Sequence, residues 1–317
     1  MTTRDHVLRA LRDSGAGGVS GESIAHVLGI SRVAVSKHVA ALRALGYVIE
    51  AVRGSGYVFV SAPDLALPAE VEPLVRDPLW HDFAGGPSTG STNDDARLLA
   101  REGAGEGCVV VAASQDAGRG RMGRTWTSPA GGAYFSVVLR PPVAPSQAGP
   151  LALVVALGVA RGLEAVGVVA GLKWPNDLQL RGHKLAGVLL EISAESDRID
   201  WVVAGVGINV SRPEHPFEGA AYLSESRPGI GAATAVAAAL DGIAEVYAVW
   251  RDGGFAPLRA AYEERSVLKG RAVVVSDLTG AVRANGTVLG IDDEGRLLVG
   301  GRAGVEAVVA GEVTLRR

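Results

Sequence analysis

The apolar positions in the first sixty residues predict three short helices followed by a hairpin. Apolar side chains recur at helical spacing in 3–13, 22–28 and 31–45. Within 47–60, two β-rich runs then flank a short turn that contains two glycines. Two closely spaced helices followed by a hairpin are typical of a winged helix-turn-helix, which we expect over residues 1–62.

The polar face of the third predicted helix carries groups that bind nucleic acid. A helical projection places Arg32, Ser36, Lys37 and Arg43 opposite the apolar side, and Arg53 lies in the turn of the hairpin. The N-terminal unit has seven Lys or Arg and four Asp or Glu, a net charge of +3, whereas the remaining 24 basic and 30 acidic residues give −6. Because phosphate contacts supply much of the affinity for DNA, this segregation favours DNA binding over the alternative of a protein-interaction module.

The rest of the chain predicts a linker, an α/β domain and a small β domain. Four prolines between 63 and 78 indicate the linker, and an α/β domain is expected over 63–267. Short strands from about 268 indicate a small β-barrel over 268–317. The β-rich runs of the α/β domain are 109–113, 133–139, 184–192 and 201–210, its helical runs are 92–101, 151–166 and 232–250, and turns of the barrel are expected at 277–280, 285–286 and 292–295.

Composition favours a cytoplasmic globular protein. The chain has 317 residues, 48% of them hydrophobic and 21% charged. The apolar stretch 151–160 is too short for a membrane span, and Arg4 and Arg9 lie where a signal peptide would be apolar. The one cysteine, Cys108, excludes an intramolecular disulfide and indicates a reducing compartment.

The segment 118–124, Gly-Arg-Gly-Arg-Met-Gly-Arg, combines three arginines with three glycines. Glycines allow close approach of the backbone to a ligand, and guanidinium groups match carboxylate and phosphate oxygens, so we expect an anion clamp. The glycines also fit the G-x-G-x-x-G pattern of dinucleotide sites. That alternative is minor, because 125–132 reads as a loop instead of a helix and no carboxylate lies between Asp116 and Glu164.

Lysine and asparagine are scarce, and several of them cluster in motifs. Each occurs four times, whereas arginine occupies most basic positions. A lysine that remains in such a chain is a candidate ligand contact, because the two cations are not interchangeable at a binding site. Lys173, Asn176 and Lys184 lie close together, and Asn93 and Asn209 end further short motifs.

These motifs together resemble those of bifunctional biotin-protein ligases that double as biotin operon repressors. The matching segments are Gly-Ser-Thr-Asn at 90–93, the arginine loop at 118–124, Lys-Trp-Pro-Asn-Asp at 173–177, Lys-Leu-Ala-Gly at 184–187 and Gly-Val-Gly-Ile-Asn at 205–209. The resemblance implies an α/β (α+β) catalytic domain with a mixed sheet, preceded by a winged helix-turn-helix and followed by an SH3-like β-barrel.

The same resemblance implies the activity and the partners. Such enzymes join biotin and ATP, with Mg2+ carried by the nucleotide, to form biotinyl-5'-AMP, and transfer the biotinyl group to a lysine of a biotin carboxyl carrier protein. The adenylate then acts as corepressor, promoting a homodimer that binds operator DNA. A ligand-sensing repressor without ligase activity and a lipoate-protein ligase are the alternatives.

The resemblance also implies roles for individual residues. Attack of a carboxylate on the α-phosphate joins two anions, so cations are needed to neutralise them. The catalytic residues expected are Lys184, Arg121 and Asp177. The expected biotin contacts are Ser91, Thr92, Asn93, Gln115, Gly118, Arg119, Gly120, Arg121, Lys184, Gly187 and Gly205, and the expected ATP or adenylate contacts are Arg119, Arg121, Arg124, Trp126, Lys173, Asn176, Lys184 and Asn209.

Two further expectations concern a metal site and the adenine pocket. The six histidines are scattered without ligand spacing, so no protein-bound metal is expected. For two of the expected biotin contacts, Ser91 and Thr92, the alternative is that one of them caps the helix that follows. Phe217 and Tyr222 are the only aromatic candidates between 211 and 223 for a clamp over the adenine, and neither is a convincing match to the family.

Overall fold

The computed structural model describes residues 2–277, 279–302 and 304–315. The chain divides into two compact units, Met1–Asp64 and Leu65–Arg317.

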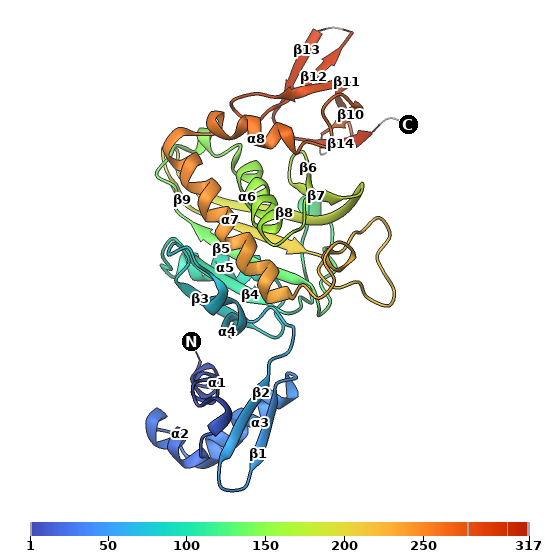
Figure 1. The fold of residues 1–317 in the computed structure, drawn as a ribbon. Coiled ribbons are helices and arrows are strands. Elements are labelled where there is room, and N and C mark those ends of the chain that lie inside the picture. The colour runs from blue at the N-terminus through green and yellow to red at the C-terminus, as the bar shows by residue number, and fades with distance from the viewer. Residues whose placement is uncertain (1, 278, 303, 316–317) are drawn as a thin grey trace. The chain divides into compact units, whose positions relative to one another are not determined.

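The N-terminal unit, blue in Figure 1, has the predicted winged helix-turn-helix fold. Serine side chains begin two of its helices: Ser20 Oγ accepts a hydrogen bond from the Ser23 amide at 3.0 Å, and Ser31 Oγ from the Ala34 amide at 3.1 Å. Gly29, at φ 64°, makes the turn between them. The elements are α1 (Thr3–Asp13), α2 (Gly21–Leu28), α3 (Arg32–Ala44), β1 (Val48–Val52) and β2 (Gly56–Ser61).

A seven-stranded mixed sheet forms the centre of the larger unit, in the order β3-β4-β5-β9-β8-β7-β6. β3 and β4 are parallel and the other neighbours are antiparallel, which confirms the predicted mixed sheet. The strands are β3 (Asp82–Gly86), β4 (Cys108–Ala112), β5 (Ala133–Leu139), β6 (Gly171–Lys173), β7 (Asp177–Leu180), β8 (His183–Ala194) and β9 (Ile199–Ile208).

Helices cover both faces of this sheet. On β4, Val109 and Val111 belong to the main core with α6 and α7, whereas Val110 packs with Ala96 and Ala100 of α5. Alternate residues of a strand point to opposite faces of the sheet. β4 is apolar throughout because both of its faces are buried. The helices are α4 (Pro68–Val71), α5 (Thr92–Arg101), α6 (Leu151–Ala165), α7 (Ala232–Gly253) and α8 (Arg259–Glu264).

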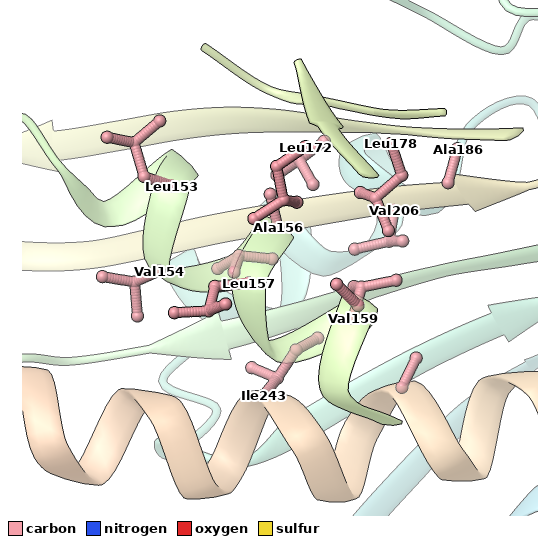
Figure 2. Close-up of a cluster of buried hydrophobic side chains, with 14 of the residues drawn as sticks. Leu153, Val154, Ala156, Leu157, Val159, Leu172, Leu178, Ala186, Val206 and Ile243 are labelled. Carbon is pink, nitrogen blue, oxygen red and sulfur yellow. The ribbon is translucent and has the colours of Figure 1, made fainter. Parts of the chain in front are cut away.

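Glycines allow α6 and α7 to cross in backbone contact. A Cβ added at Gly158 would lie 2.5 Å from Ile243 Cα, one at Gly162 would lie 1.9 Å from the Ala238 carbonyl oxygen, and one at Gly242 would lie 2.2 Å from the Gly158 carbonyl oxygen. Figure 2 shows the side chains of α6 filling the space between the sheet and α7. The close crossing lets both helices bury apolar side chains against the same face of the sheet.

α7 is the one helix in the described residues with the length and hydropathy of a membrane span. In that stretch 67% of the residues are buried within the protein, and α7 packs along α6 as a core helix.

The C-terminal strands form an antiparallel five-stranded sheet in the order β13-β12-β11-β10-β14. The turn predicted at 285–286 is wrong, because Asn285 and Gly286 lie inside β11 and pair with β10. Gly286 is needed for packing, since a Cβ there would lie 2.0 Å from the Gly300 carbonyl oxygen. Asp292 and Gly295 form the predicted turn at 292–295, and Asp277 and Gly280 form that at 277–280, of which Leu278 lies outside the described residues. The strands are β10 (Ala272–Ser276), β11 (Val282–Ile291), β12 (Leu297–Gly301), β13 (Gly304–Val308) and β14 (Glu312–Leu315).

Candidate active site

One cavity gathers almost all of the predicted ligand contacts of the larger unit. Its walls come from the start of α5, the arginine loop, the turn between β6 and β7, strands β8 and β9, and the start of β14. Of the predicted contacts it includes Ser91, Thr92, Asn93, Gln115, Arg119, Gly120, Arg121, Arg124, Trp126, Lys173, Asn176, Asp177, Lys184, Gly187 and Gly205.

Gly118 and Asn209 do not line this cavity. A Cβ at Gly118 would lie 2.4 Å from the Trp126 carbonyl oxygen, so this glycine allows the loop to fold back on itself. Asn209 Nδ2 donates to the Lys184 carbonyl at 3.2 Å and lines a second cavity together with Tyr134 and Tyr222.

The dinucleotide alternative does not agree with the loop's structure. Arg121–Gly123 forms a single 3-10 turn, with Met122 at φ 60°, and the chain then runs through a loop into β5. No helix therefore opens at Gly123 to receive a pyrophosphate at its N-terminus.

Neutral polar groups line the end of the cavity beside α5. The amide and hydroxyl of Thr92 donate to Gln115 Oε1 at 2.8 and 3.1 Å, and Gln115 Nε2 donates to Ser128 Oγ at 2.9 Å. The fully buried Ser136 Oγ lies 2.8 Å from Thr92 Oγ1 and 2.7 Å from Asn93 Oδ1. Ser91 is at the N-cap position but makes no capping hydrogen bond through its side chain. These hydrogen bonds hold the side chains of the network in fixed orientations. A site for an uncharged polar ligand needs its donors and acceptors preorganised in this way.

Ser136 was not among the residues predicted from sequence. It is the one polar residue in the β5 segment Ala-Tyr-Phe-Ser-Val-Val-Leu, and that interruption of a buried strand is the signal that could have identified it.

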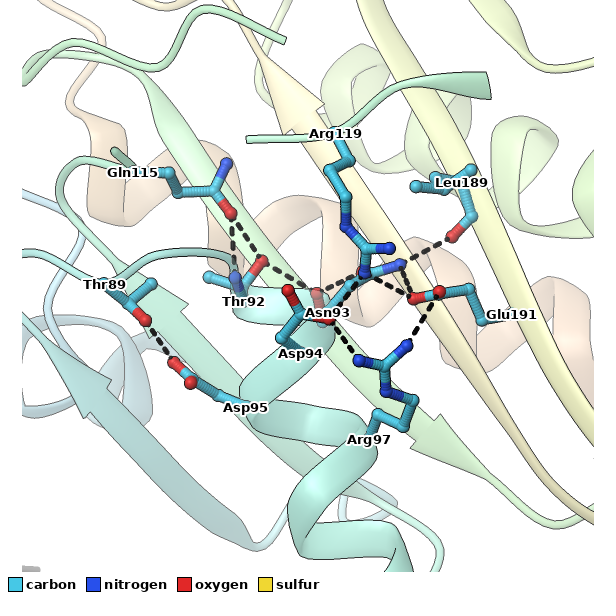
Figure 3. Close-up of polar contacts among 11 residues, drawn as sticks. Thr89, Thr92, Asn93, Asp94, Asp95, Arg97, Gln115, Arg119, Leu189 and Glu191 are labelled. Atoms are coloured by element: carbon cyan, nitrogen blue, oxygen red, sulfur yellow. Dashed lines mark hydrogen bonds and ion pairs between the residues drawn. The ribbon is translucent and has the colours of Figure 1, made fainter. Parts of the chain in front are cut away.

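Arg119 is paired with protein carboxylates in this structure (Figure 3). Its Nη2 lies 2.7 Å from Asp94 Oδ1 and 3.1 Å from Glu191 Oε2, and Arg97 bridges the same two carboxylates. Asn93 Nδ2 donates to Glu191 Oε2 at 3.0 Å. The guanidinium therefore anchors the loop to α5 and β8, and Asp94 and Glu191 are site residues that the sequence did not reveal.

Arg121 is the least exposed of the three arginines with which the loop lines the cavity. Its Nη1 donates to Asn176 Oδ1 at 3.0 Å, and Asn176 Nδ2 donates to the Val188 carbonyl at 2.7 Å. Burial lowers the pKa of Arg121, whereas the nearby carboxylates of Asp177 and Glu312 oppose that shift. A partly desolvated guanidinium held in this way gains more from an anionic ligand than an exposed one would.

Lys184 and Asp177 form an ion pair beside an indole ring. Lys184 Nζ lies 2.7 Å from Asp177 Oδ1 and 5.1 Å from the centroid of the Trp126 ring. The ring lies over two paired glycines, since a Cβ at Gly207 would lie 2.5 Å from Trp126 Nε1 and one at Gly187 would lie 3.2 Å from its Cζ3. Trp126 Nε1 is buried and has no hydrogen-bond partner, and the indole ring contributes a flat apolar surface to the cavity.

Part of the cavity wall comes from the C-terminal sheet, through Gly311, Glu312 and Val313. Arg124 forms an ion pair with Glu312 of β14, and Arg121 Nη2 donates to the Gly311 carbonyl at 3.4 Å. Trp174 Nε1 donates to the Gly295 carbonyl at 3.0 Å, which fixes the C-terminal sheet to the turn that carries Asn176.

The two aromatic candidates for an adenine clamp lie at the second cavity. Tyr222 is only 2% exposed, and its hydroxyl accepts a hydrogen bond from the Phe217 amide at 3.0 Å. Phe217 is 36% exposed and lines the second cavity. Neither lines the main cavity, whose aromatic lining residues are Trp126 and Trp174.

The predicted DNA face lies in the N-terminal unit and is largely exposed. Arg32, Ser36, Lys37 and Arg53 are exposed at α3 and at the tip of the β1–β2 hairpin. Arg43 is exposed as well, and its Nε and Nη2 donate to the Ile49 carbonyl at 2.8 and 2.6 Å and so tie α3 to β1.

A mixed sheet whose cavity places lysine and arginine side chains beside neutral polar groups, joined to a winged helix-turn-helix, is the arrangement of a DNA-binding acyl-activating ligase. Residues 85–209 match the biotin/lipoate A/B protein ligase family, residues 3–58 match an HTH domain, and residues 269–316 match the C-terminal domain of biotin protein ligases. The chain belongs to the biotin/lipoate A/B protein ligase family, and within it to the bifunctional ligase/repressors.

Relatives and solved structures agree with this placement. The chain is 34% identical to the bifunctional ligase/repressor BirA of Bacillus subtilis over 99% of both chains, and 32% identical to that of Escherichia coli K12 over 94% of this chain and 92% of the relative. The larger unit is similar to the biotin protein ligase of Aquifex aeolicus in complex with biotin and ATP. That match has a TM-score of 0.65 and 29% identity, and it covers 75% of this chain and all of the other.

Proposed function

We propose that the protein activates biotin with ATP and transfers the biotinyl group to a lysine of a carrier protein. A biotin carboxylate oxygen bonds to the α-phosphorus of ATP, the bond from that phosphorus to the bridging oxygen breaks, and diphosphate leaves with the electron pair. The observation that carries this proposal is the joining, in one cavity, of Lys184 and Arg121 with the neutral network around Thr92 and Gln115.

The two ends of the cavity suit the two ends of biotin. Ser91, Thr92 and Gln115 present the donors and acceptors that an uncharged ureido ring would use. Lys184 and Arg121 lie where the carboxylate and the α-phosphate meet, and Asp177 keeps the Lys184 ammonium in place until they arrive. Fixed cations at the point where two anions react lower the barrier without reorganising during the reaction.

The nucleotide base is proposed to lie against Trp126. The support is that Trp126 lines the cavity and that its indole ring lies over Gly187 and Gly207. Asn209 then contributes indirectly, by holding the Lys184 backbone at the end of β9.

Magnesium is proposed to arrive with ATP, held by phosphate oxygens and water. In the described part of the chain there is no group of three or more His, Cys, Asp or Glu side chains placed to hold a metal ion.

In the second half-reaction, the lysine nitrogen of the carrier bonds to the acyl carbon of the adenylate and loses a proton, and AMP leaves with the electrons of the broken C–O bond. Asp177 is proposed to orient the lysine amine of the carrier for this step. The carrier is proposed to be a biotin carboxyl carrier protein or domain. The support is the similarity of this chain to two proteins named biotin--[acetyl-CoA-carboxylase] ligase.

The N-terminal unit is proposed to bind operator DNA in the cytoplasm, with the adenylate as corepressor of a homodimer. Arg32, Ser36, Lys37, Arg43 and Arg53 are its candidate contacts, and Arg43 also ties α3 to β1. In operator-binding measurements, the adenylate should increase affinity and dimer content, whereas biotin alone should not.

One incubation tests the enzymatic proposal against its alternatives. The protein is mixed with magnesium, ATP and either biotin or lipoate, and the products are identified by mass. We expect biotinyl-5'-AMP and biotin-dependent exchange of diphosphate into ATP. Formation of lipoyl-AMP only would make the protein a lipoate ligase, and binding of biotin without any adenylate would make it a sensor.

A further inference from the structure

A carboxylate of the C-terminal sheet lies among the cations of the active-site cavity. Glu312, the first residue of β14, pairs with Arg124 and lines the cavity with Lys173 and Arg121. Its pKa is lowered, first by the hydrogen bond from Arg124 and then by the charges of Arg124, Lys173 and Arg121. Glu312 is therefore an anion paired with Arg124 in a cavity that Lys173 and Arg121 also line.

The position of this anion matters because the cavity must accept a polyanion. Lys184 and Arg121 lie at the junction of the carboxylate and the α-phosphate, so the two outer phosphates of ATP must extend further along the cavity. The remaining cations that line it are Arg119, which is engaged by Asp94 and Glu191, and Arg124 and Lys173 beside Glu312. The outer phosphates and Glu312 thus compete for the same charges.

The ion pair is of a kind that a phosphate can replace. The side chains of Arg124 and Glu312 are 60% and 43% exposed, and exposed ion pairs contribute little to stability. Arg121 stays in place when that pair opens, because Asn176 and the Gly311 carbonyl hold it independently.

We propose that the diphosphate portion of ATP binds to Arg124 and Lys173 in place of the Glu312 carboxylate. This inference rests on the proposed adenylation reaction and identifies the subsite for its leaving group. Glu312 leaves Arg124 when ATP binds. After the bond between the α-phosphorus and the bridging oxygen breaks, Glu312 competes for Arg124 again and so favours release of diphosphate.

The test measures binding of four ligands to the full-length protein and to Glu312→Gln by calorimetry, with magnesium present. The ligands are ATP, inorganic diphosphate, AMP and biotin. Glu306→Gln, an exposed glutamate on β13 of the same sheet, is the matched control. Glutamine keeps the shape of Glu312 without its charge, and the thermal midpoint of each unliganded variant checks that it folds.

For Glu312→Gln we expect ATP and diphosphate to bind about tenfold more tightly, the factor that corresponds to 1.4 kcal/mol. AMP and biotin should change by less than twofold, and Glu306→Gln should match the wild type for all four ligands. If Glu312→Gln binds ATP more tightly but diphosphate no more tightly, the subsite binds the intact nucleotide only. That result would overturn the proposed effect of Glu312 on the release of diphosphate. Weaker binding of ATP, an equal gain for AMP, or no change would overturn the proposal as a whole.

A second variant keeps the result interpretable. Arg124→Gln should lose affinity for diphosphate, and adding Glu312→Gln to it should restore less than the tenfold gain, because the shared cation is gone. Failure of wild-type protein to bind ATP at all, with biotin bound normally, would instead contradict the adenylation reaction on which the inference rests.

Discussion

Gly207→Ala should impair use of ATP while leaving use of biotin nearly intact. The backbone of Gly207 is outside the left-handed region, so alanine can adopt it, but the new Cβ would lie 2.5 Å from Trp126 Nε1 and 2.6 Å from Cε2. Ordinary contact requires 3.4 Å or more, so the indole must move by about 1 Å. A displacement of that size in an active site costs up to about 100-fold in rate, equivalent to about 2.7 kcal/mol.

The assay is biotin-dependent exchange of labelled diphosphate into ATP, with each substrate varied in turn. The value of kcat/KM for ATP should fall by about 100-fold, with less than a threefold change in KM for biotin. The indole can shift toward the cavity, so the loss of unfolding free energy should be near the low end of the roughly 1–3 kcal/mol range for overpacking.

Two other glycines complete the comparison. Gly86→Ala, in β3, adds a Cβ with no atom within 4 Å and should behave as wild type. Gly205→Ala would place a Cβ 1.9 Å from Asn93 Oδ1 and should raise KM for biotin instead. A kcat/KM for ATP in Gly207→Ala equal to that of Gly86→Ala would refute the placement of the base on Trp126.

Three further changes probe other parts of the larger unit. Asp94→Asn combined with Glu191→Gln releases Arg119 and should raise KM for biotin about tenfold, because the loop loses its charged anchor; unchanged steady-state kinetics would contradict this anchoring. Lys184→Gln should lower the rate of adenylate formation by about 10²–10³ in rapid-quench measurements, with binding of biotin largely retained; near-normal rates would remove Lys184 from the chemistry. The hydrogen bond from Thr279 lowers the pKa of Asp277 to about 2. The stabilisation by Asp277 is therefore present above the unfolded value of 3.8 and is lost as pH falls toward 2, so the difference in thermal midpoint between wild type and Asp277→Asn should shrink from pH 7 to pH 2.

The elements that sequence predicted well are those with strong local signals. α1, α5 and β5 have the predicted bounds, because helical spacing and a run of buried β-forming residues leave few alternatives. The Asn285–Gly286 turn failed because the same two residues are favoured in turns, whereas here Gly286 is required by the carbonyl of Gly300 on a neighbouring strand. A contact between residues on two different strands cannot be predicted from the residues next to Gly286 in the sequence.

The same distinction applies to the candidate site. The motifs place Lys184, Arg121 and Thr92 in the cavity because each lies in a short, distinctive segment. The partners of Arg119 could not be read from sequence, since Asp94 and Glu191 are ordinary surface-type residues that only the fold brings together. Glu312 was missed for the same reason.

The crossing of α6 and α7 limits how the larger unit can move. Gly158 and Gly242 meet where there is no room for a Cβ, so the helices have one compatible register. A slide by one turn would bring branched residues such as Val154 or Val246 to that crossing. Shear between these two helices is therefore blocked, and any rearrangement that a ligand causes in this unit has to leave their register unchanged.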